Sequence, residues 1–389
     1  MPDQTADIPR VLAVVDSSYT TDREFLSGVL KYIRTNGPWQ LDLRLGREDD
    51  APPRPDDYDG LIVKATGDLK FIGAMRKKIP LIQLDGQKRL SNVIAHVRAE
   101  NVRIARTAAR FLSAKRCRSY AAVGARIPLT WSDMRTAAFC REMARQGLAV
   151  ESYDGVGSTD DLARKLLRLP KPAGVFAVND IRARDVVDAC RSAGLEIPGD
   201  IALLGVDNDE LMCETSAPTL SSIPMNIESA GYQAAERLAQ VLSGKPAPAD
   251  IDIFYGGTSV VERPSTDIRI ASDALVRRCC AKIAERTELP FDVSSLVSTA
   301  GCSRRHLEMQ FLRILGHSPA VEIRRQRVNR AIVLLECGVS QTEAAARCQF
   351  TDVSHMHRTF KSVLGKLPSE FQNQLNNPSQ RRNPARSGQ

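Results

Sequence analysis

Three aspartates stand at the ends of apolar runs that are typical of buried strands. The runs VLAVVD (11–16), AGVFAVND (173–180) and IALLGVD (201–207) end at Asp16, Asp180 and Asp207. A carboxylate has two acceptor oxygens, which can take hydrogen bonds from two adjacent hydroxyl groups. In open parallel sheets, ligands bind beyond the carboxyl ends of the strands. We therefore interpret the three aspartates as a candidate polyol site; the alternative is that each one only caps the following helix.

A second candidate pair lies in the run PLTWSDMRTAAF, just after a predicted strand over 119–125. Trp131 can stack on the apolar face of a pyranose, and Arg135 can donate a fork of hydrogen bonds to hydroxyl and ring oxygens. The alternative is that Ser132 or Asp133 caps the helix that begins there and that Arg135 is merely solvated.

Strand-like and helix-like segments alternate through the first 270 residues, and these elements must position the candidate side chains. Continuous apolar runs between helical patterns indicate parallel sheets covered on both faces. The number of units exceeds one small sheet, so we expect an α/β domain of two doubly wound lobes. The further strands are expected over 41–45, 60–65 and 79–85, and the helices over 25–33, 99–114, 180–193 and 227–242.

Several motifs of this region resemble the effector-binding core of LacI/GalR-type regulators, which share the fold of periplasmic sugar-binding proteins. The matching residues are Asn179–Asp180, the Gly-x-x-x-Pro-x-Asp-Ile turn at 194–201, Gly-Val-Asp at 205–207, Pro-Thr-Leu-Ser-Ser-Ile at 218–223 and Gly-Tyr-Gln-Ala-Ala at 231–235. The resemblance covers about 10–265. It implies that Asp180, Asp207 and Arg135 contact a sugar and that Asp16 lies in the matching first loop. Only about ten residues precede the first strand, so we expect a different module to bind DNA.

The excess positive charge lies entirely in the last third of the chain. The net charge is +8, and residues 272–389 hold 18 Lys and Arg against 10 Asp and Glu, whereas residues 1–271 are neutral. A neutral sensor suits an uncharged ligand, and a basic module suits a polyanion such as DNA.

The basic region contains a first helix–turn–helix pattern over 293–316. A helix over 293–300 ends at Gly301, and Ser303 stands at the N-cap position of a second helix. Leu296, Leu307, Phe311 and Leu315 have the spacing of one buried face. The residues expected to point outward toward DNA are Arg304, Arg305, Glu308 and Met309.

The pattern recurs over 339–365, with helices over 341–348 and from Val353, and a long helix over 320–337 joins the two units. One unit alone is weak evidence, but a pair joined by a basic helix predicts two recognition helices in successive major grooves. His355 and His357 are two positions apart and so lie on different helix faces, which argues against a metal pair. We expect Ser354, His357, Arg358 and Lys361 to point outward, and Met356, Phe360 and Leu364 to point inward.

This region, over 275–372, resembles the AraC/XylS DNA-binding domain. The residues that carry the resemblance are Ser303–Leu307 with Phe311, Gly316-x-Ser-Pro319, Arg327 with Ala331, Leu334–Leu335, Phe350, Phe360 and Leu367–Phe371. One departure is Gln349, where the family usually has a glycine before Phe350.

The order of the two modules resembles that of xylose-responsive regulators, through NDIRARD (179–185), DNDEL (207–211) and VERPSTD (261–267). The resemblance implies xylose as the effector. Lys64, in GLIVKAT (60–66), departs from those regulators, which have an acidic loop there, and can change the hydroxyl pattern that is recognised.

We therefore expect a sugar-responsive transcriptional activator, with an effector domain over 10–265, a linker over 266–274, a DNA-binding domain over 275–372 and a disordered tail over 373–389. The expected partners are promoter DNA, a monosaccharide, RNA polymerase and a second copy of the chain in a homodimer. No apolar run reaches the length of a membrane span, and the nine scattered cysteines contain no C-x-x-C pair. We expect free thiols, a cytoplasmic location, and no metal, cofactor or enzymatic activity. The alternatives are a ligand-independent architectural DNA-binding protein and a regulator of a different monosaccharide.

Overall fold

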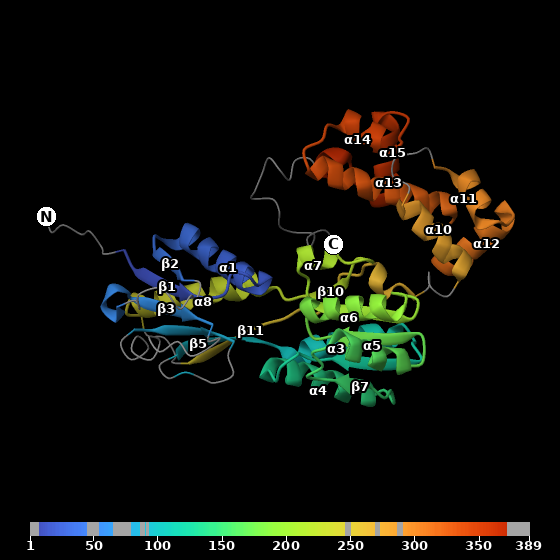
Figure 1. The fold of residues 1–389 in the computed structure, drawn as a ribbon. Coiled ribbons are helices and arrows are strands. Elements are labelled where there is room, and N and C mark those ends of the chain that lie inside the picture. Colours follow the sequence, from blue (N-terminus) through green and yellow to red (C-terminus); the bar gives the residue numbers. More distant parts are fainter. Residues whose placement is uncertain are drawn as a thin grey trace. The chain divides into compact units, whose positions relative to one another are not determined.

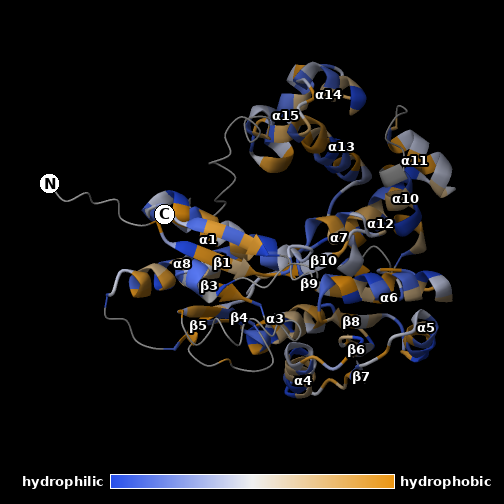
Figure 2. Cartoon of the chain, turned by 60° about the vertical axis from the view of Figure 1, so that its left-hand side comes forward, coloured by the Kyte–Doolittle hydropathy of each residue, from blue (hydrophilic) through white to orange (hydrophobic). Residues whose placement is uncertain are grey.

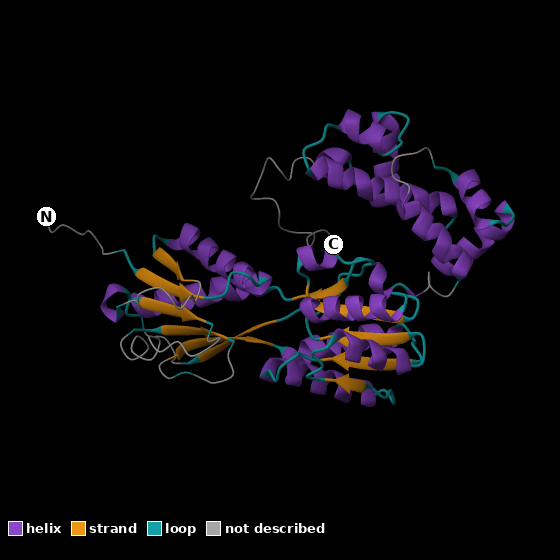
Figure 3. Cartoon of the chain, in the orientation of Figure 1, coloured by secondary structure: helices purple, strands orange, loops and turns teal. Residues whose placement is uncertain are grey.

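The computed structural model describes residues 8–44, 54–64, 79–85, 90, 93–245, 250–268, 273–285 and 291–371. The chain divides into two units, Met1–Asp267 and Ile268–Gln389 (Figure 1). The described strands all belong to the first unit, and the described elements of the second are helices (Figure 3). The predicted tail over 373–389 lies outside the described residues.

The first lobe of the first unit is built on a six-stranded sheet in the order β11-β5-β4-β3-β1-β2. All of its strand pairs are parallel. Strands β1, β3 and β4 are buried along almost their whole length, as expected for a parallel sheet that is covered on both faces. The strands are β1 (Arg10–Val14), β2 (Gln40–Arg44), β3 (Gly60–Val63), β4 (Leu81–Leu84), β5 (Val93–Ala99) and β11 (Ile251–Tyr255).

The second lobe has a five-stranded parallel sheet in the order β10-β9-β8-β6-β7. Its strands are β6 (Ser119–Val123), β7 (Glu151–Tyr153), β8 (Ala173–Ala177), β9 (Ile201–Asp207) and β10 (Ser221–Pro224). Helices connect the strands of both lobes: α1 (Thr20–Asn36), α3 (Asn101–Ala114), α4 (Thr130–Ala144), α5 (Thr159–Arg168), α6 (Asp180–Ala193), α7 (Glu210–Glu214) and α8 (Ile227–Leu242). These helices carry hydrophobic and hydrophilic residues in alternation, as expected when one face packs on a sheet (Figure 2).

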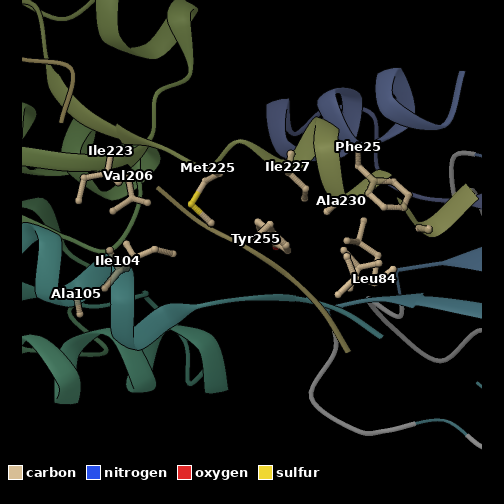
Figure 4. Packing of buried hydrophobic residues seen from close by; sticks show 14 of the residues in the cluster. Phe25, Leu84, Ile104, Ala105, Val206, Ile223, Met225, Ile227, Ala230 and Tyr255 are labelled. Atoms are coloured by element: carbon tan, nitrogen blue, oxygen red, sulfur yellow. The ribbon is translucent and has the colours of Figure 1, made fainter. Parts of the chain in front are cut away.

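The chain passes between the lobes three times: after β5, after β10 and after β11. One hydrophobic cluster runs through these crossings and includes residues of both lobes. Met225 and Tyr255 lie in the middle of it, with Phe25 and Leu84 on one side and Val206 on the other (Figure 4). The two lobes therefore share a continuous core at the hinge.

Helices α1 and α8 approach closely because each has a glycine at the contact. A Cβ atom added to Gly28 would lie 1.9 Å from the carbonyl oxygen of Glu228, and one added to Gly231 would lie 2.1 Å from that of Phe25. These distances leave no room for a side chain, which explains Gly231 in the run GYQAA.

The expected two-lobed α/β fold is confirmed, and several predicted elements have the observed bounds. Helices α6 and α8 and strand β9 begin and end at the predicted residues. In this unit the sequence interpretation missed β5, β7, β10, β11, α5 and α7. Strand β5 was missed because its run VIAHVRA mixes polar residues into the apolar pattern, and β7 has only three residues.

The second unit consists of two helix–turn–helix units joined by α13 (Pro319–Glu336). The first contains α11 (Val293–Ala300) and α12 (Arg304–Leu315), preceded by α10 (Ala274–Glu285), and the second contains α14 (Gln341–Arg347) and α15 (Val353–Leu364). Each unit has its own hydrophobic cluster, and α13 contributes to both, through Ile323 to the first and Val328 to the second.

Side-chain caps fix where these short helices begin. Asp292, Ser303, Ser340 and Asp352 each accept a hydrogen bond from a backbone N–H in the first turn of their helix. The predicted buried positions Leu296, Leu307, Phe311, Met356 and Phe360 are confirmed, whereas Leu315 is only partly buried. Leu364 was expected to face inward but is 38% exposed, because α15 ends at that residue and Gly365 turns the chain away.

Candidate functional site

Arg135 is a buried cation at the edge of the second lobe. Its side chain is on α4, only 4% of the residue is exposed, and it donates hydrogen bonds to Asn101 Oδ1 (2.8 Å) and to the carbonyl of Val178 (2.7 Å). Its guanidinium lies 4.9 Å from the centre of the Trp131 ring. The reading of Arg135 as a solvated residue is therefore wrong. Trp131 has Arg135 over its ring and also packs against the hydrophobic cluster of the hinge, so it is only partly exposed.

Asp207, the last residue of β9, lies where charges of both lobes meet. Burial raises its pKa to about 7, while Arg135 of its own lobe and Lys64 of the other lobe act to lower it. The backbone is unusual here, since Asp207 has φ 109° and Asn208 has φ 53°. Left-handed backbone at a non-glycine residue is costly and recurs at ligand-binding sites.

Asp180 is a buried carboxylate near Asp207, and both of its oxygens accept hydrogen bonds from the protein. It accepts hydrogen bonds from Ser222 Oγ (2.6 Å) and from the backbone N–H of Asp209 (2.9 Å), and only 1% of the residue is exposed. Burial raises its pKa well above the ordinary value, and the charge of Asp207 adds to the shift. Asp180 therefore supports the turn that follows β9, rather than lying on the open surface.

In the first lobe, Asp16 and Lys64 follow the adjacent strands β1 and β3. The N–H of Lys64 donates to the carbonyl of Val14, and its Nζ bonds to Asp22 Oδ1 at 2.5 Å. The buried Asp22 also accepts the N–H of Asp16 at 3.1 Å. Hydrogen bonds from Ser18 lower the pKa of Asp16, so this carboxylate is ionised at neutral pH.

Two direct contacts hold the strand-end loops in place, and the sequence interpretation missed both. Thr20 Oγ1 donates to Asp209 Oδ2 at 2.5 Å, which joins α1 of the first lobe to the start of α7 in the second. Tyr255 Oη donates to Asp85 Oδ2, also at 2.5 Å. Asp85 could have been found, because the predicted strand over 79–85 ends in aspartate like the other three. The Thr20–Asp209 contact has no sequence signal, since 189 residues separate the pair.

None of the three strand-end aspartates is an N-cap residue. The cap of α6 is Asn179, whose side chain accepts the N–H of Arg182, and the cap of α7 is Asp209. Ser132 does not cap α4 either, because its Oγ accepts the N–H of Ala125 at 2.8 Å. Arg135 thus lies over the Trp131 ring and its charge acts on Asp207, while the charge of Lys64 acts on both Asp207 and Asp16. Asp180 is buried.

On the first recognition helix, α12, the four expected side chains reach the surface to different degrees. Arg304 and Arg305 are exposed, and Met309 is 57% exposed. Glu308 is only partly exposed and pairs with Arg304, whose Nε lies 2.9 Å from Glu308 Oε1. Within the part of the chain that the structure describes, these four residues thus comprise one unpaired cation, one ion pair and one apolar side chain.

On the second recognition helix, α15, Ser354, Arg358 and Lys361 are exposed. His357 is half-buried, and its Nε2 lies 2.7 Å from Gln341 Oε1 on α14. The neighbouring His355 is directed to Thr351 instead, with its Nδ1 3.0 Å from Thr351 Oγ1. The two histidines therefore serve different partners.

Gln349 supplies the turn for which the resemblance would call for glycine. Its φ of 61° is the left-handed conformation that glycine adopts freely. Its Oε1 accepts hydrogen bonds from the N–H of Phe291 (3.1 Å) and from Arg327 (3.2 Å). The side chain thus ties the second helix–turn–helix unit to the first.

Among the described residues, no group of three or more His, Cys, Asp or Glu side chains has the arrangement of a metal site. None of the described helices is both long and apolar enough to cross a bilayer. All nine cysteines are free, as predicted, and four of them are buried.

Comparison with known proteins identifies both domains. Residues 109–266 match the family model of the periplasmic binding protein-like domain, and residues 296–374 match that of a helix-turn-helix domain. The fold as a whole is similar to a solved structure of the xylose-binding transcription activator XylR, with a TM-score of 0.71 and 23% identity over 95% of this chain and 98% of that one.

A two-lobed sensor domain joined to a double helix–turn–helix domain defines a ligand-responsive, DNA-binding transcription regulator. Within this class the chain is similar to the xylose operon regulatory proteins. It is 25% identical to that of Haemophilus influenzae, over 93% of this chain and 97% of the relative. It is also 25% identical to that of Escherichia coli K12, over 93% and 96%.

Proposed function

We propose that the chain is a transcriptional activator whose effector is a neutral monosaccharide, with D-xylose as the leading candidate. The observation that carries the proposal is the meeting of Asp207, Arg135 and Lys64, which brings a carboxylate of one lobe between cations of both lobes. A polyol can donate to the carboxylate and accept from the cations at the same time. The names of the full-length relatives, which are xylose operon regulators, favour xylose among the sugars.

The proposed effector-binding residues are Asp16, Trp131, Arg135, Asp180 and Asp207. In this assignment Asp16, Arg135 and Asp207 contact the sugar and Trp131 stacks on it, while Asp180 acts through the turn after β9. Closure of the lobes on the sugar selects one of two pre-existing arrangements.

The proposed DNA-binding residues are Arg304, Arg305, Glu308 and Met309 of α12 and Ser354, His357 and Arg358 of α15. Three of these seven side chains already have protein partners, since His357 is held by Gln341 and Arg304 is paired with Glu308. These side chains must change partner to contact DNA. We further propose a cytoplasmic homodimer that recruits RNA polymerase, with the domain boundaries expected from the sequence.

The test is thermal unfolding of the full chain with D-xylose, D-ribose, L-arabinose and D-glucose. A ligand at about 100 times its dissociation constant stabilises the folded state by about 2.7 kcal/mol. We expect D-xylose to give the largest shift, Asp207→Ala to lose it, and Asp188→Ala, at a partly exposed position on α6 of the same lobe, to keep it. If no sugar shifts the transition, the proposal fails and a ligand-independent architectural role takes its place.

The second arm measures DNA binding and promoter output with and without the sugar that gives the shift. We expect tighter binding or higher output in its presence. Equal values in both conditions would contradict a ligand-controlled activator.

A further inference from the structure

The segment that leaves the sensor domain is fastened to the turn that carries Asp207. This exit segment, Val261–Thr266, immediately precedes Asp267, the last residue of the first unit. It includes the short helix η2 (Pro264–Thr266). Two residues connect this segment to the turn: Ser222 of β10, which bonds to both, and Arg263 of the segment itself.

Ser222 of β10 is a junction between the exit segment and the effector side of the domain. Its backbone pairs with Val261 in both directions, with N–H to carbonyl distances of 3.1 and 2.9 Å. Its Oγ accepts the N–H of Asn208 (3.0 Å) and donates to Asp180 Oδ1 (2.6 Å). The residue is fully buried, so these bonds are shielded from water.

Arg263 makes the second connection, with its side chain. One nitrogen, Nη1, donates to Asn208 Oδ1 (2.9 Å) and to the carbonyl of Leu220 (3.0 Å), and Nε lies 2.7 Å from Glu214 Oε1 of α7. The guanidinium therefore joins the residue after Asp207, the residue before β10 and the helix α7. A planar fork can satisfy such a set of acceptors in fixed geometry, which a lysine cannot do.

The exit segment cannot move independently of β9 and β10. Ser221 Oγ accepts the N–H of Arg263 at 2.8 Å, and Ser265 Oγ donates to the carbonyl of Leu203 on β9 at 2.7 Å. Ser265 and Thr266 are fully buried. A displacement of the turn after β9 is thus passed to the end of the unit rather than absorbed by a loose linker.

From these contacts we infer that Arg263, through Asn208, is a positioning residue that couples effector binding at Asp207 to the chain segment leading into the DNA-binding domain. Asp207 and Asn208 both hold left-handed backbone, so a bound ligand that alters Asp207 changes a turn that is already costly to maintain. Because Arg263 is bonded to Asn208, a displacement of Asn208 moves Arg263 and with it the exit segment. The inference rests on the proposed function, because it takes Asp207 as the effector contact.

The test compares effector binding with effector-dependent DNA binding in the full chain. The DNA probe is a duplex selected by the wild-type protein from a random-sequence library, and the effector is D-xylose. Coupling in such proteins changes affinity by about 5- to 150-fold. In Arg263→Met we expect the ratio of DNA affinities with and without D-xylose to fall to within about twofold of one, while D-xylose affinity of the free protein stays within about threefold of wild type.

A second variant guards against misfolding of the first. Asn208→Gly removes the acceptor of Arg263 and suits the left-handed backbone, so the turn itself is retained. Arg191→Met is the matched control, because Arg191 is an exposed arginine of the same lobe whose side chain pairs with Asp188. It should keep both properties.

Coupling is reciprocal, so the D-xylose affinity measured with and without DNA must lose its difference to the same extent. Wild-type coupling in a folded Arg263→Met or Asn208→Gly variant would overturn the inference. Loss of D-xylose binding in both variants would also overturn it, because Arg263 would then belong to the effector site. If wild-type protein binds no sugar, the proposed function fails instead, and the two failures are distinguishable.

Discussion

The hydroxyl of Thr20 in one lobe donates a hydrogen bond of 2.5 Å to the carboxylate of Asp209 in the other lobe. Arg23 donates to the same hydroxyl at 2.7 Å, and the N–H of Asp209 donates to Asp180. The contact therefore links the start of α1 to the buried carboxylate under the candidate effector site. It stabilises the arrangement in which the two lobes are in contact.

Replacing Thr20 by valine removes this bond and keeps the shape of the side chain. A hydrogen bond to a charged group contributes about 1.5–3 kcal/mol. We expect the effector affinity of Thr20→Val to fall by about tenfold, because the lobes must be brought together without this bond. Isothermal titration with D-xylose measures the change.

Thr35→Val is the control, since Thr35 is an exposed residue of the same helix that bonds only to the preceding turn. If Thr20→Val and Thr35→Val have the same affinity, the Thr20–Asp209 contact does not favour the ligand-bound arrangement.

The raised pKa of Asp207 predicts how the protein responds to pH. Since its pKa is about 7 instead of 3.8, the folded protein keeps a proton that the unfolded chain releases. Its contribution to stability is thus fully present below about pH 4 and is lost as the pH rises toward 7. Asp207→Asn removes this dependence. Chemical unfolding at several pH values should show a flatter curve for the variant than for the wild type.

The same group predicts the pH dependence of effector binding. The ionised carboxylate is the stronger hydroxyl acceptor, so D-xylose affinity should rise between about pH 6 and about pH 8. An affinity that is constant over this range in the wild type would mean that Asp207 does not accept a hydrogen bond from the ligand.

Replacing Arg135 should lower both the stability of the fold and the binding of the ligand, and the two effects can be measured separately. Removing a buried, hydrogen-bonded arginine leaves Asn101 and the carbonyl of Val178 without their donor, and we expect Arg135→Met to lose about 2–4 kcal/mol of unfolding free energy. If the variant is folded, D-xylose should no longer raise its melting temperature. The control Arg141→Met changes an exposed residue on the same helix and should behave as wild type.

The strand ends could be predicted from sequence because each one is a buried apolar run followed by an aspartate. That pattern found Asp16, Asp180 and Asp207 and correctly positioned Arg135 on the helix after β6. It could not tell which carboxylate is buried, since the burial of Asp180 depends on Ser222 and on the turn at Asp209, which approach it only in the folded chain.

The helical domain was more predictable than the sensor domain, because its caps and turns are local. Ser303 accepts the N–H of His306 only three residues away, and Gly301 has the left-handed φ of 63° that a helix end requires. By contrast, the edge strand β11 pairs with β5, more than 150 residues earlier, and its short run gave no periodic signal. Long-range pairing and lobe-to-lobe contacts were therefore the part that sequence reasoning missed.

Replacing Arg305 of α12 tests whether the first recognition helix contacts a base or a phosphate through this residue. It is exposed and makes no side-chain hydrogen bond or ion pair with the described residues, whereas Arg304 is paired with Glu308. If Arg305 contacts a base, Arg305→Ala should weaken binding by about 1–3 kcal/mol and relax specificity at one position of the site. If it contacts phosphate, all sequences should weaken alike and the salt dependence should decrease. Competition with a panel of single-base variants separates the two, and unchanged binding would exclude α12 from the interface at this residue.

Gln349 offers a test of the turn between α14 and α15. Glycine there would relieve the left-handed backbone but lose the bonds to Phe291 and Arg327, whereas alanine would lose the bonds and keep the strain. We expect Gln349→Ala to be less stable than Gln349→Gly by about 1 kcal/mol, the usual cost of this backbone conformation at a residue with a Cβ. Chemical unfolding of the full chain measures the difference. Both variants should also lose affinity for DNA that carries the sites of both helix–turn–helix units. The loss should be larger than for DNA that carries the site of one unit, because the bonds of Gln349 fix one unit to the other. Equal stability of the two variants would show that the turn relaxes when the side chain is removed.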